Sequence, residues 1–539
     1  MAVRGVGALL LLPFFASVAS AIVRNGKVGA NIPRIQLVKK VDLPDVGPVV
    51  DRNGTEIPPY NTTYYFEQLI DHNDPSLGTF SQRYWHTWEF YEPGGPIIIT
   101  TPGEQDADGF EGFLTNQTID GQIAQEQNGA TIVLEHRYYG YSNPYNNLSV
   151  ASLKYHTIQQ AIDDLAYFAY NVKLGMPGGD HVTPAEAPWI LIGGSYAVRT
   201  VFLRITAGVP QCLTSYSKPD VFWAAWASSG VVESIVNYWG YFDIIRQFMP
   251  ANCSADVQAI VGYFDDIVAK NDTSAIDALK ATFNMTALTH LDDVGGALSD
   301  PLGSWQDLQP NSELSDNAFF EFCDALEVKD GENAPPQGWG LEHALQAYGS
   351  WWTNTYYQTS KCARRSQGEC LGSYDPTQDV YTDISINNAE RSWFWIVCNE
   401  MGFYQGGAPD GIPTIVSRLI QPIYEERQCT YFFPEAFSTP PTPQANATNA
   451  AYKGWDVQSD RLFFGNGLRD PWRDATVSAD GQLIPSTPWQ PIAVGDGFHC
   501  SEMYTANAEV DWTIAAVQAE GRTAMSAWLR GWKAPTQSS

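Results

Sequence analysis

The stretch Pro188-Trp-Ile-Leu-Ile-Gly-Gly-Ser-Tyr-Ala197 is the part of this chain from which its fold can best be inferred. Its apolar first half predicts a buried strand that runs directly into Gly-x-Ser-x-Ala. A turn this tight needs small residues two positions before and after the serine, and these are Gly193 and Ala197. It holds the Ser195 hydroxyl above the sheet and aims the following backbone N–H groups at a reacting carbonyl. The motif alone also arises by chance, so its interpretation depends on partners elsewhere in the chain.

Two further strand ends carry the partners that a serine nucleophile needs. The apolar run Leu462–Phe464 leads into a glycine-rich turn with Asp470, and Pro491–Val494 leads into a second such turn with His499. The chain order is serine, acid, histidine, which is the order in α/β-hydrolases and differs from that in chymotrypsin and subtilisin. Open α/β sheets build their sites at the carboxyl ends of strands, so the three side chains are expected to meet there.

Together these residues predict nucleophilic catalysis. A serine hydroxyl is a poor nucleophile at its free pKa, so His499 would take its proton and later pass it to the leaving amine. Asp470 would hold the imidazole in the correct tautomer. Taken singly, a loop histidine is more often structural and an Asp-Pro pair is usually a turn. Three such residues at strand ends, in one permitted order, favour a Ser195–Asp470–His499 triad.

The apolar pattern predicts an α/β fold, namely an α/β-hydrolase core with an inserted helical cap. From Gly95 onward strand and helix patterns alternate, as in a mostly parallel sheet with helices on both faces. From Ile235 to about Ser438 helical patterns dominate, and strand signals resume at Leu462. The predicted division is a signal peptide at 1–21, a leader or propeptide at 22–59, the first part of the core at 60–234, the cap at 235–438 and the second part of the core at 439–535.

Six spaced blocks agree in order with one known family. They are Phe66–His72 with Gln82–Trp85, Gly94–Glu104, Glu135–Gly140, Trp393–Phe403, Asn466–Trp472 and Gly497–Cys500. On these blocks the chain resembles the serine peptidase family of lysosomal prolyl carboxypeptidase, dipeptidyl peptidase II and the fungal acid prolyl endopeptidases. The resemblance covers roughly residues 61 to 532. It implies a helical cap and a peptidase that cleaves after proline, preferably in acid, through an acyl-enzyme.

Acyl transfer also needs hydrogen-bond donors for the developing oxyanion. The backbone N–H of Tyr196, directly after the nucleophile, is one expected donor. The second is expected from the loop after the first core strand, at Gly103 or Glu104. Tyr138 and Tyr139 also end a core strand and are further candidates, and the alternative role of both is packing under the sheet.

The resemblance further implies a slot for the prolyl ring, which is flat and apolar and is best held by aromatic walls. Trp472, next to Asp470, would form one wall, and Met401 and Phe403 would come from the cap. Core packing is the alternative for each of the three. Glu400 has two interpretations: it binds a substrate amino terminus, or it pairs with an arginine.

One segment departs from the family pattern. Val198 to Lys218 separates the nucleophile turn from the next strand by more residues than the family uses. It is either a tolerated insertion or a disturbance that leaves an inactive homologue. A lipase or esterase is a less favoured alternative, because the HGGG-type motif is absent. Endopeptidase, carboxypeptidase and dipeptidyl peptidase modes all remain open.

The N-terminus and the sequons indicate the secretory route. Arg4, the apolar run from Ala8 to Phe15 and Ala19-Ser-Ala21 form a signal-peptide pattern. Eight Asn-x-Ser/Thr sequons are candidate glycosylation sites, at Asn53, Asn61, Asn116, Asn147, Asn252, Asn271, Asn284 and Asn446. We therefore expect a secreted or a vacuolar, lysosome-like protein.

Eight cysteines in an oxidising compartment predict disulfides, although sequence does not give their pairing. The close pair Cys362 and Cys370 is a candidate loop clip, and the family resemblance implies that Cys398 pairs with Cys429. Cys212 lies in the departing segment. No CxxC pair or histidine cluster indicates zinc, so we expect no metal and no cofactor.

The charge balance restricts the kinds of partner that the protein can bind. Sixty acidic residues against 31 basic ones give a formal charge of −29, which argues against nucleic acid and anionic membranes. It fits a protein that works in acid, where part of this charge is neutralised, but equally a merely soluble acidic protein. We expect peptide or protein substrates and no membrane anchor; the oligomeric state is open, a homodimer included.

Overall fold

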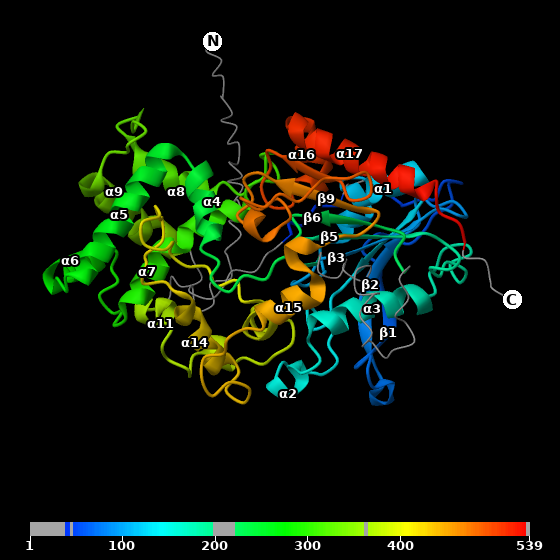
Figure 1. Cartoon of the computed structure of the whole chain (residues 1–539), viewed down its shortest axis with the longest axis horizontal. Helices are drawn as coiled ribbons and strands as arrows, with labels where there is room; N and C mark the ends of the chain where they lie inside the picture. The colour runs from blue at the N-terminus through cyan, green and yellow to red at the C-terminus, as the bar shows by residue number, and fades with distance from the viewer. Residues whose placement is uncertain (1–37, 44–46, 198–220, 360–364, 535–539) are drawn as a thin grey trace, which may run out of the picture.

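The computed structural model describes residues 38–43, 47–197, 221–359 and 365–534 (Figure 1). The predicted signal peptide and the segment Val198 to Lys218 lie outside these residues, so both stay predictions. Among the described residues no helix is long and apolar enough to cross a bilayer.

Eight strands form one mixed sheet in the order β1-β2-β4-β3-β5-β6-β9-β10. They are β1 (Thr63–Leu69), β2 (Thr79–Thr87), β3 (Ile97–Thr101), β4 (Ala130–Leu134), β5 (Trp189–Gly194), β6 (Ala224–Ser228), β9 (Leu462–Gly467) and β10 (Ile492–Gly495). β2 runs antiparallel to β1 and β4, and the remaining neighbours are parallel. The four strands β3 to β6 are entirely buried and mostly apolar, as expected for a parallel sheet covered on both faces. With the serine turn directly after β5, this is the α/β-hydrolase arrangement, and the predicted fold class is confirmed.

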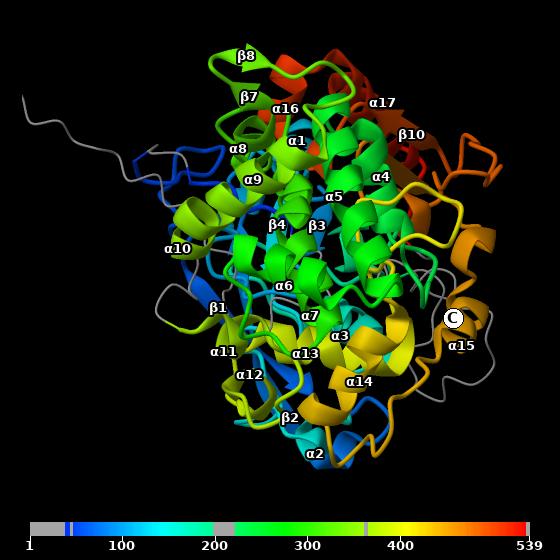
Figure 2. The same cartoon turned by 90° about the vertical axis from the view of Figure 1, so that its left-hand side faces the viewer.

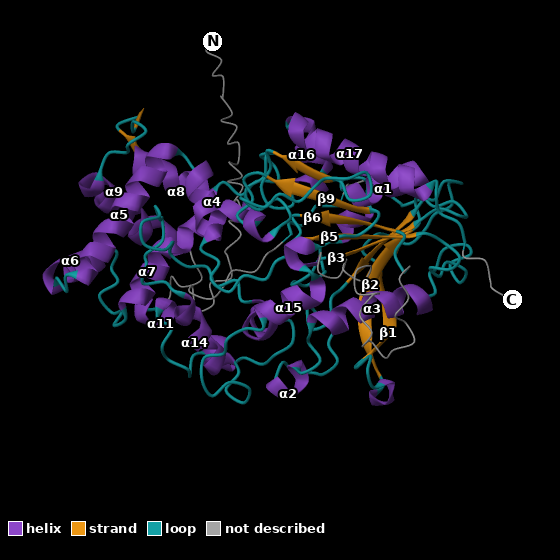
Figure 3. Ribbon diagram, in the orientation of Figure 1, coloured by secondary structure: helices purple, strands orange, loops and turns teal. Residues whose placement is uncertain are grey.

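Helices cover both faces of the sheet (Figure 3). α1 (Ile119–Gln127), α16 (Thr505–Val510) and α17 (Trp512–Leu529) lie on one face, and α3 (Ile158–Asn171) lies on the other, with the short α2 (Val150–Leu153) preceding it. Gly521 lets α17 approach β6 closely, because a Cβ at this position would overlap the indole of Trp226. The indole of Trp226 also packs on Phe463 of β9, with ring centroids 4.5 Å apart.

The chain between β6 and β9 is mainly helical, as the sequence predicts, and its first helices lie beside the sheet (Figure 2). They are α4 (Gly240–Phe248), α5 (Ala251–Ala269), α6 (Thr273–Thr282), α7 (Leu291–Ser299), α8 (Ala318–Glu327), α9 (Leu341–Trp351), α10 (Tyr357–Thr359), α11 (Gln367–Leu371), α12 (Asp379–Thr382), α13 (Ala389–Ile396), α14 (Pro422–Phe432) and α15 (Ala445–Tyr452). A small hairpin, β7 (Val328–Lys329) and β8 (Glu332–Asn333), follows α8. The boundaries of a separate cap domain stay a prediction.

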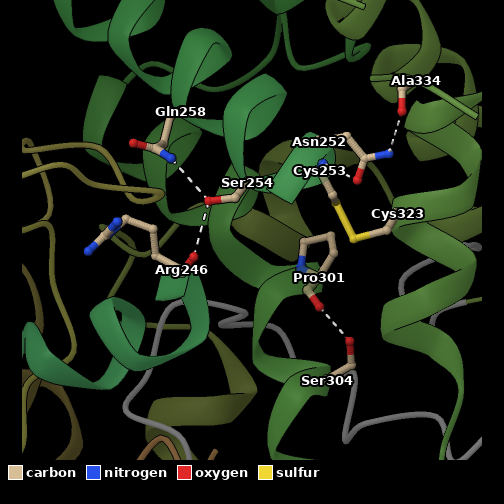
Figure 4. The surroundings of a disulfide bond; sticks show 9 residues. All are labelled: Arg246, Asn252, Cys253, Ser254, Gln258, Pro301, Ser304, Cys323 and Ala334. Atoms are coloured by element: carbon tan, nitrogen blue, oxygen red, sulfur yellow. Dashed lines mark hydrogen bonds between the residues drawn. A yellow bond between two sulfur atoms is a disulfide. The ribbon is translucent and has the colours of Figure 1, made fainter. Parts of the chain in front are cut away.

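Disulfides bind this helical region together. Cys253 of α5 is bonded to Cys323 of α8 (Figure 4). Cys398 is bonded to Cys429 of α14, which confirms the pairing implied by the family resemblance. Crosslinks that close loops of 70 and 31 residues stabilise a fold by about 4 kcal/mol each in the chain-entropy model. Cys370 is also disulfide-bonded; Cys362 and Cys212 lie outside the described residues.

The described part of the predicted leader is packed into the core. Val38 and Val41 are buried, the backbone N–H of Lys39 donates to Tyr504 Oη at 2.8 Å, and Gln105 Nε2 donates to the Val38 carbonyl at 3.0 Å. We call residues 38–41 the N-terminal strap. It joins the start of the chain to the loop after β3 and to the end of the chain.

Candidate active site

Ser195 stands in a strained turn at the carboxyl end of β5. Its φ is +58°, a left-handed conformation that serine rarely adopts, and the residue is buried. Gly194 is required before it: an added Cβ would lie 2.8 Å from Val38 Cγ2, 3.0 Å from Met503 Sδ and 3.2 Å from Cys500 Sγ. The strap and the histidine loop therefore both press against the turn that carries the serine.

The parallel pairing of β9 with β10 brings the acid to the histidine. The turns that follow these strands are joined by the Leu468 N–H to the Gly495 carbonyl, at 2.8 Å, and the Arg469 N–H to the Gly497 carbonyl, at 2.9 Å. As a result His499 Nδ1 lies 2.9 Å from Asp470 Oδ1, and both side chains are almost completely buried. The acid–histidine hydrogen bond that the sequence predicts is therefore present.

The electrostatics of this pair suit a general base. Burial alone would lower the pKa of His499, but the Asp470 carboxylate raises that pKa well above its ordinary value. Nδ1 donates to the carboxylate, so Nε2 is the nitrogen left to take a proton. Among the described residues Nε2 of His499 has no hydrogen-bond partner.

A fixed contact sets the histidine loop beside the nucleophile turn. The backbone N–H of Cys500 donates to Ser229 Oγ at 2.9 Å, directly after β6. The Cys500 thiol in turn faces Gly194. The structure thus places the three predicted residues after the carboxyl ends of β5, β9 and β10, with β6 between β5 and β9 in the sheet.

The loop after β3 reaches the same place. Gly103 has φ +73°, and a Cβ on it would lie 3.4 Å from the Ala197 Cβ and 3.6 Å from the Ala197 nitrogen. Glu104 is buried and interacts electrostatically with Tyr139. The Tyr196 ring packs on Trp393, with ring centroids 5.4 Å apart. Of the predicted oxyanion residues, Tyr196 adjoins the serine in the chain and Gly103 lies against Ala197.

Of the predicted pocket residues, the three apolar ones are buried, and the fourth, Glu400, makes a hydrogen bond to the backbone. Trp472 is fully buried and meets Phe403 with ring centroids 5.3 Å apart. Met401 is also buried, directly after α13. The Glu400 carboxylate accepts the backbone N–H of Ile158 at 3.3 and 3.4 Å, in the first turn of α3, and both interpretations of this residue stay predictions.

Sequence reasoning missed part of the aromatic cluster. Tyr238 stacks on Trp472 at 5.2 Å between centroids, and Tyr241 meets it edge-on at 5.4 Å. Gln306 accepts a hydrogen bond from Trp472 Nε1 at 2.8 Å. These residues lie 166 to 234 positions before Trp472 in the chain, so no local pattern could connect them. The only sequence signal for this cluster is that aromatic residues are frequent around Tyr238 and Tyr241.

Comparison with known proteins identifies the family. The family model described as serine carboxypeptidase S28 matches residues 68–520. Serine protease vicPa of Bipolaris victoriae is 34% identical over 485 residues, which are 86% of this chain and 88% of that protein. The "Probable extracellular serine carboxypeptidase" of Arthroderma benhamiae is 33% identical over 74% of this chain and 56% of that protein, and the thymus-specific serine protease of Mus musculus is 25% identical over 81% of this chain and 82% of that protein. Among solved structures, an open-form lipase covers 87% of this chain at 9% identity with a TM-score of 0.30, too distant to bear on function. This chain belongs to the serine carboxypeptidase S28 family and is a serine peptidase.

Proposed function

We propose that this serine peptidase hydrolyses peptide bonds through a Ser195–Asp470–His499 triad. The observation that carries the proposal is the buried 2.9 Å hydrogen bond between Asp470 and His499, held beside the strained serine turn. His499 Nε2 would accept the Ser195 proton as Oγ attacks the scissile carbonyl, and then donate it to the leaving amine. Water would be deprotonated by the same nitrogen to release the acyl group, which restores the free serine.

The backbone N–H of Tyr196 would stabilise the oxyanion, together with a donor from the Gly103–Glu104 segment. Support comes from the close approach of Gly103 to Ala197. Loss of one such donor typically lowers kcat about a hundredfold or more. A backbone N–H group in the loop after β3 would therefore contribute to the rate as a catalytic side chain does.

Proline would occupy the subsite next to the cleaved bond. Support comes from the aromatic cluster around Trp472 and Phe403, which directly follows the triad acid and offers apolar ring faces. Glu400 would act here indirectly, through the start of α3. Digestion of peptides that differ only in the position of one proline would test this subsite, and the fragments would also distinguish endopeptidase, carboxypeptidase and dipeptidyl peptidase modes.

The enzyme would act outside the cell and in acid, where its folded state is most stable although kcat/KM is not at its highest. The disulfides and the extracellular relative support secretion. The formal charge of −29 favours acid for stability, since protonation of carboxylates reduces self-repulsion. The pKa of His499 has the opposite effect on rate, because only the neutral imidazole is a base. We therefore expect kcat/KM to rise with pH while thermal stability falls, and parallel measurement of both would separate the two effects.

Labelling with a fluorophosphonate is the decisive experiment. The secreted full chain should be labelled, and Ser195→Ala should not be, since the reagent needs an activated serine. Intact mass should show Val198 to Lys218 in the labelled protein. A folded protein that resists labelling would instead mark this chain as an inactive homologue.

A further inference from the structure

We propose that Arg83 is a positioning residue that holds the loop carrying Gly103 against the nucleophile turn. The inference rests on the proposed triad chemistry. Arg83 belongs to β2, which is separated from β3 by β4 in the sheet. It touches none of the proposed triad residues through any contact described above, so its effect on catalysis would pass through the loop.

The Arg83 guanidinium binds three carboxylates at once. Nε and Nη2 donate to the two oxygens of Glu135 at 2.9 and 2.5 Å. Nη2 also donates to Asp106 at 2.8 Å, and Nη1 donates to Asp108 at 3.0 Å. The Arg83 side chain is 10% exposed and that of Glu135 is fully buried, so the bonds between these two are shielded from solvent, whereas Asp108 is 55% exposed. The planar fork of arginine matches this arrangement, whereas a lysine ammonium does not.

Glu135 joins two loops at the end of β4. Its carboxylate accepts the backbone N–H of Ala107 at 3.1 Å, in the loop after β3. It also accepts Ser142 Oγ at 2.6 Å and the Ser142 N–H at 2.9 Å, in the loop after β4. A fully buried carboxylate is costly without a cation, so Arg83 makes this junction possible.

The junction lies close in sequence to the proposed oxyanion donor. Asp106 is three residues from Gly103, and Gly103 contacts Ala197 of the nucleophile turn. A shift of the loop at Asp106 would therefore move the donor, and a misplacement of about 1 Å can cost about a hundredfold in rate. Trp85 and Tyr141 flank the guanidinium at 5.1 and 4.8 Å, which limits any adjustment.

A purely structural ion pair is the competing explanation, and a matched variant separates the two. Arg137 is equally buried and donates to Asp164 Oδ2 at 2.6 Å. It anchors the Leu69 and Tyr155 carbonyls instead of the loop after β3. Arg83→Lys and Arg137→Lys, each in the full chain, therefore both replace a buried guanidinium group by an ammonium group. Only the first of them changes the hydrogen bonds to the loop after β3.

The test compares kcat, KM and Tm for the two variants. Arg83→Lys should lower kcat about ten- to a hundredfold with KM within about twofold, because the donor acts on the transition state. The same variant should bind a peptide aldehyde inhibitor more weakly by a similar factor, because the hemiacetal oxygen of the bound inhibitor occupies the oxyanion hole. Arg137→Lys should lower Tm and leave kcat within about threefold. Equal losses of kcat in both variants, or an unchanged aldehyde affinity in Arg83→Lys, would overturn the inference.

A second variant covers the case in which Arg83→Lys does not fold. Asp106→Asn with Asp108→Asn keeps the Arg83–Glu135 pair and removes the negative charges by which the loop binds Arg83. It should lower kcat about tenfold, and a wild-type kcat would contradict the inference. Failure of the wild-type protein to react with a fluorophosphonate would instead reject the proposed function itself.

Discussion

Asp470 and His499 are brought together by backbone pairing and not by any feature of their own side chains. Each follows a strand of the same parallel pair, and the two turns are hydrogen-bonded to each other. Trp472 contributes by donating its backbone N–H to Asp470 Oδ1 at 2.9 Å. The carboxylate is therefore fixed from two sides before any substrate arrives.

This geometry predicts the effect of Asp470→Asn. The amide would keep the shape of the site but would favour the wrong imidazole tautomer, so kcat should fall about ten-thousandfold. Steady-state kinetics with the folded variant would measure the loss. Asp496→Asn is the matched control, since Asp496 lies in the adjoining turn that carries His499 but pairs with Arg469 at 2.8 Å; its kcat should stay within about threefold. A variant Asp470→Asn with a tenth of normal kcat would rule out the assigned role.

At this scale the sequence is informative about the triad and much less so about the pocket. Each triad residue directly follows an apolar run, so its place at a strand end can be predicted from local pattern. Tyr238 and Tyr241 reach Trp472 only through the packing of distant segments. Glu400 meets a backbone N–H of α3, and no residue pattern could distinguish that contact from an ion pair.

At the scale of elements, close helix–sheet packing depends on single small residues. Gly521 of α17 touches Trp226 of β6, whereas Gly262 of α5 has open space where its Cβ would be. Both are helical glycines, so they share the same backbone propensity and differ in surroundings.

Substitution of the two glycines by alanine should therefore have opposite effects. Gly262→Ala should raise the free energy of unfolding by about 0.5–1 kcal/mol, through helix propensity. Gly521→Ala should lower it by about 1–3 kcal/mol, since the new methyl group would displace the Trp226 indole. Chemical denaturation of both variants would measure the difference. A stabilised Gly521→Ala would show that α17 can move away from the sheet without cost.

Elements differ in how far they can be predicted. The core strands are continuous apolar runs, and their alternation with helices predicts a mostly parallel sheet, but not the order of its strands. The helices between β6 and β9 can be predicted as a group, but not their mutual packing. The Cys253–Cys323 bond was not predicted, because several pairings of the cysteines fit the sequence equally well.

At the scale of the whole molecule, buried carboxyl groups make the folded state more stable in acid than at neutral pH. Burial raises the pKa of Asp120, in the first turn of α1, to about 7 and that of Asp163 to about 6. Both values lie above the ordinary value for aspartate, so the folded state holds protons that the unfolded state has already lost between about pH 4 and 7. Stability should be complete below this window and should fall as the pH rises through it.

Asp120→Asn tests this dependence. The variant lacks the titrating group, so its Tm should decline less between pH 4 and 7 than the Tm of the natural chain. Asp277→Asn, at an exposed position of α6, should leave the decline unchanged. Differential scanning calorimetry across this range would decide, and identical slopes for all three proteins would contradict the assignment.

The N-terminal strap also bears on when the enzyme becomes active during its synthesis. Residues 38–41 are made long before Tyr504, which accepts the Lys39 N–H from 465 residues further along the chain. The turn around Ser195 is therefore supported on both sides only after Tyr504 has been made. A partly translated chain would hold the serine without its strap in place and without its histidine. Support of the serine turn is therefore a late event, since it joins segments that lie far apart in the chain.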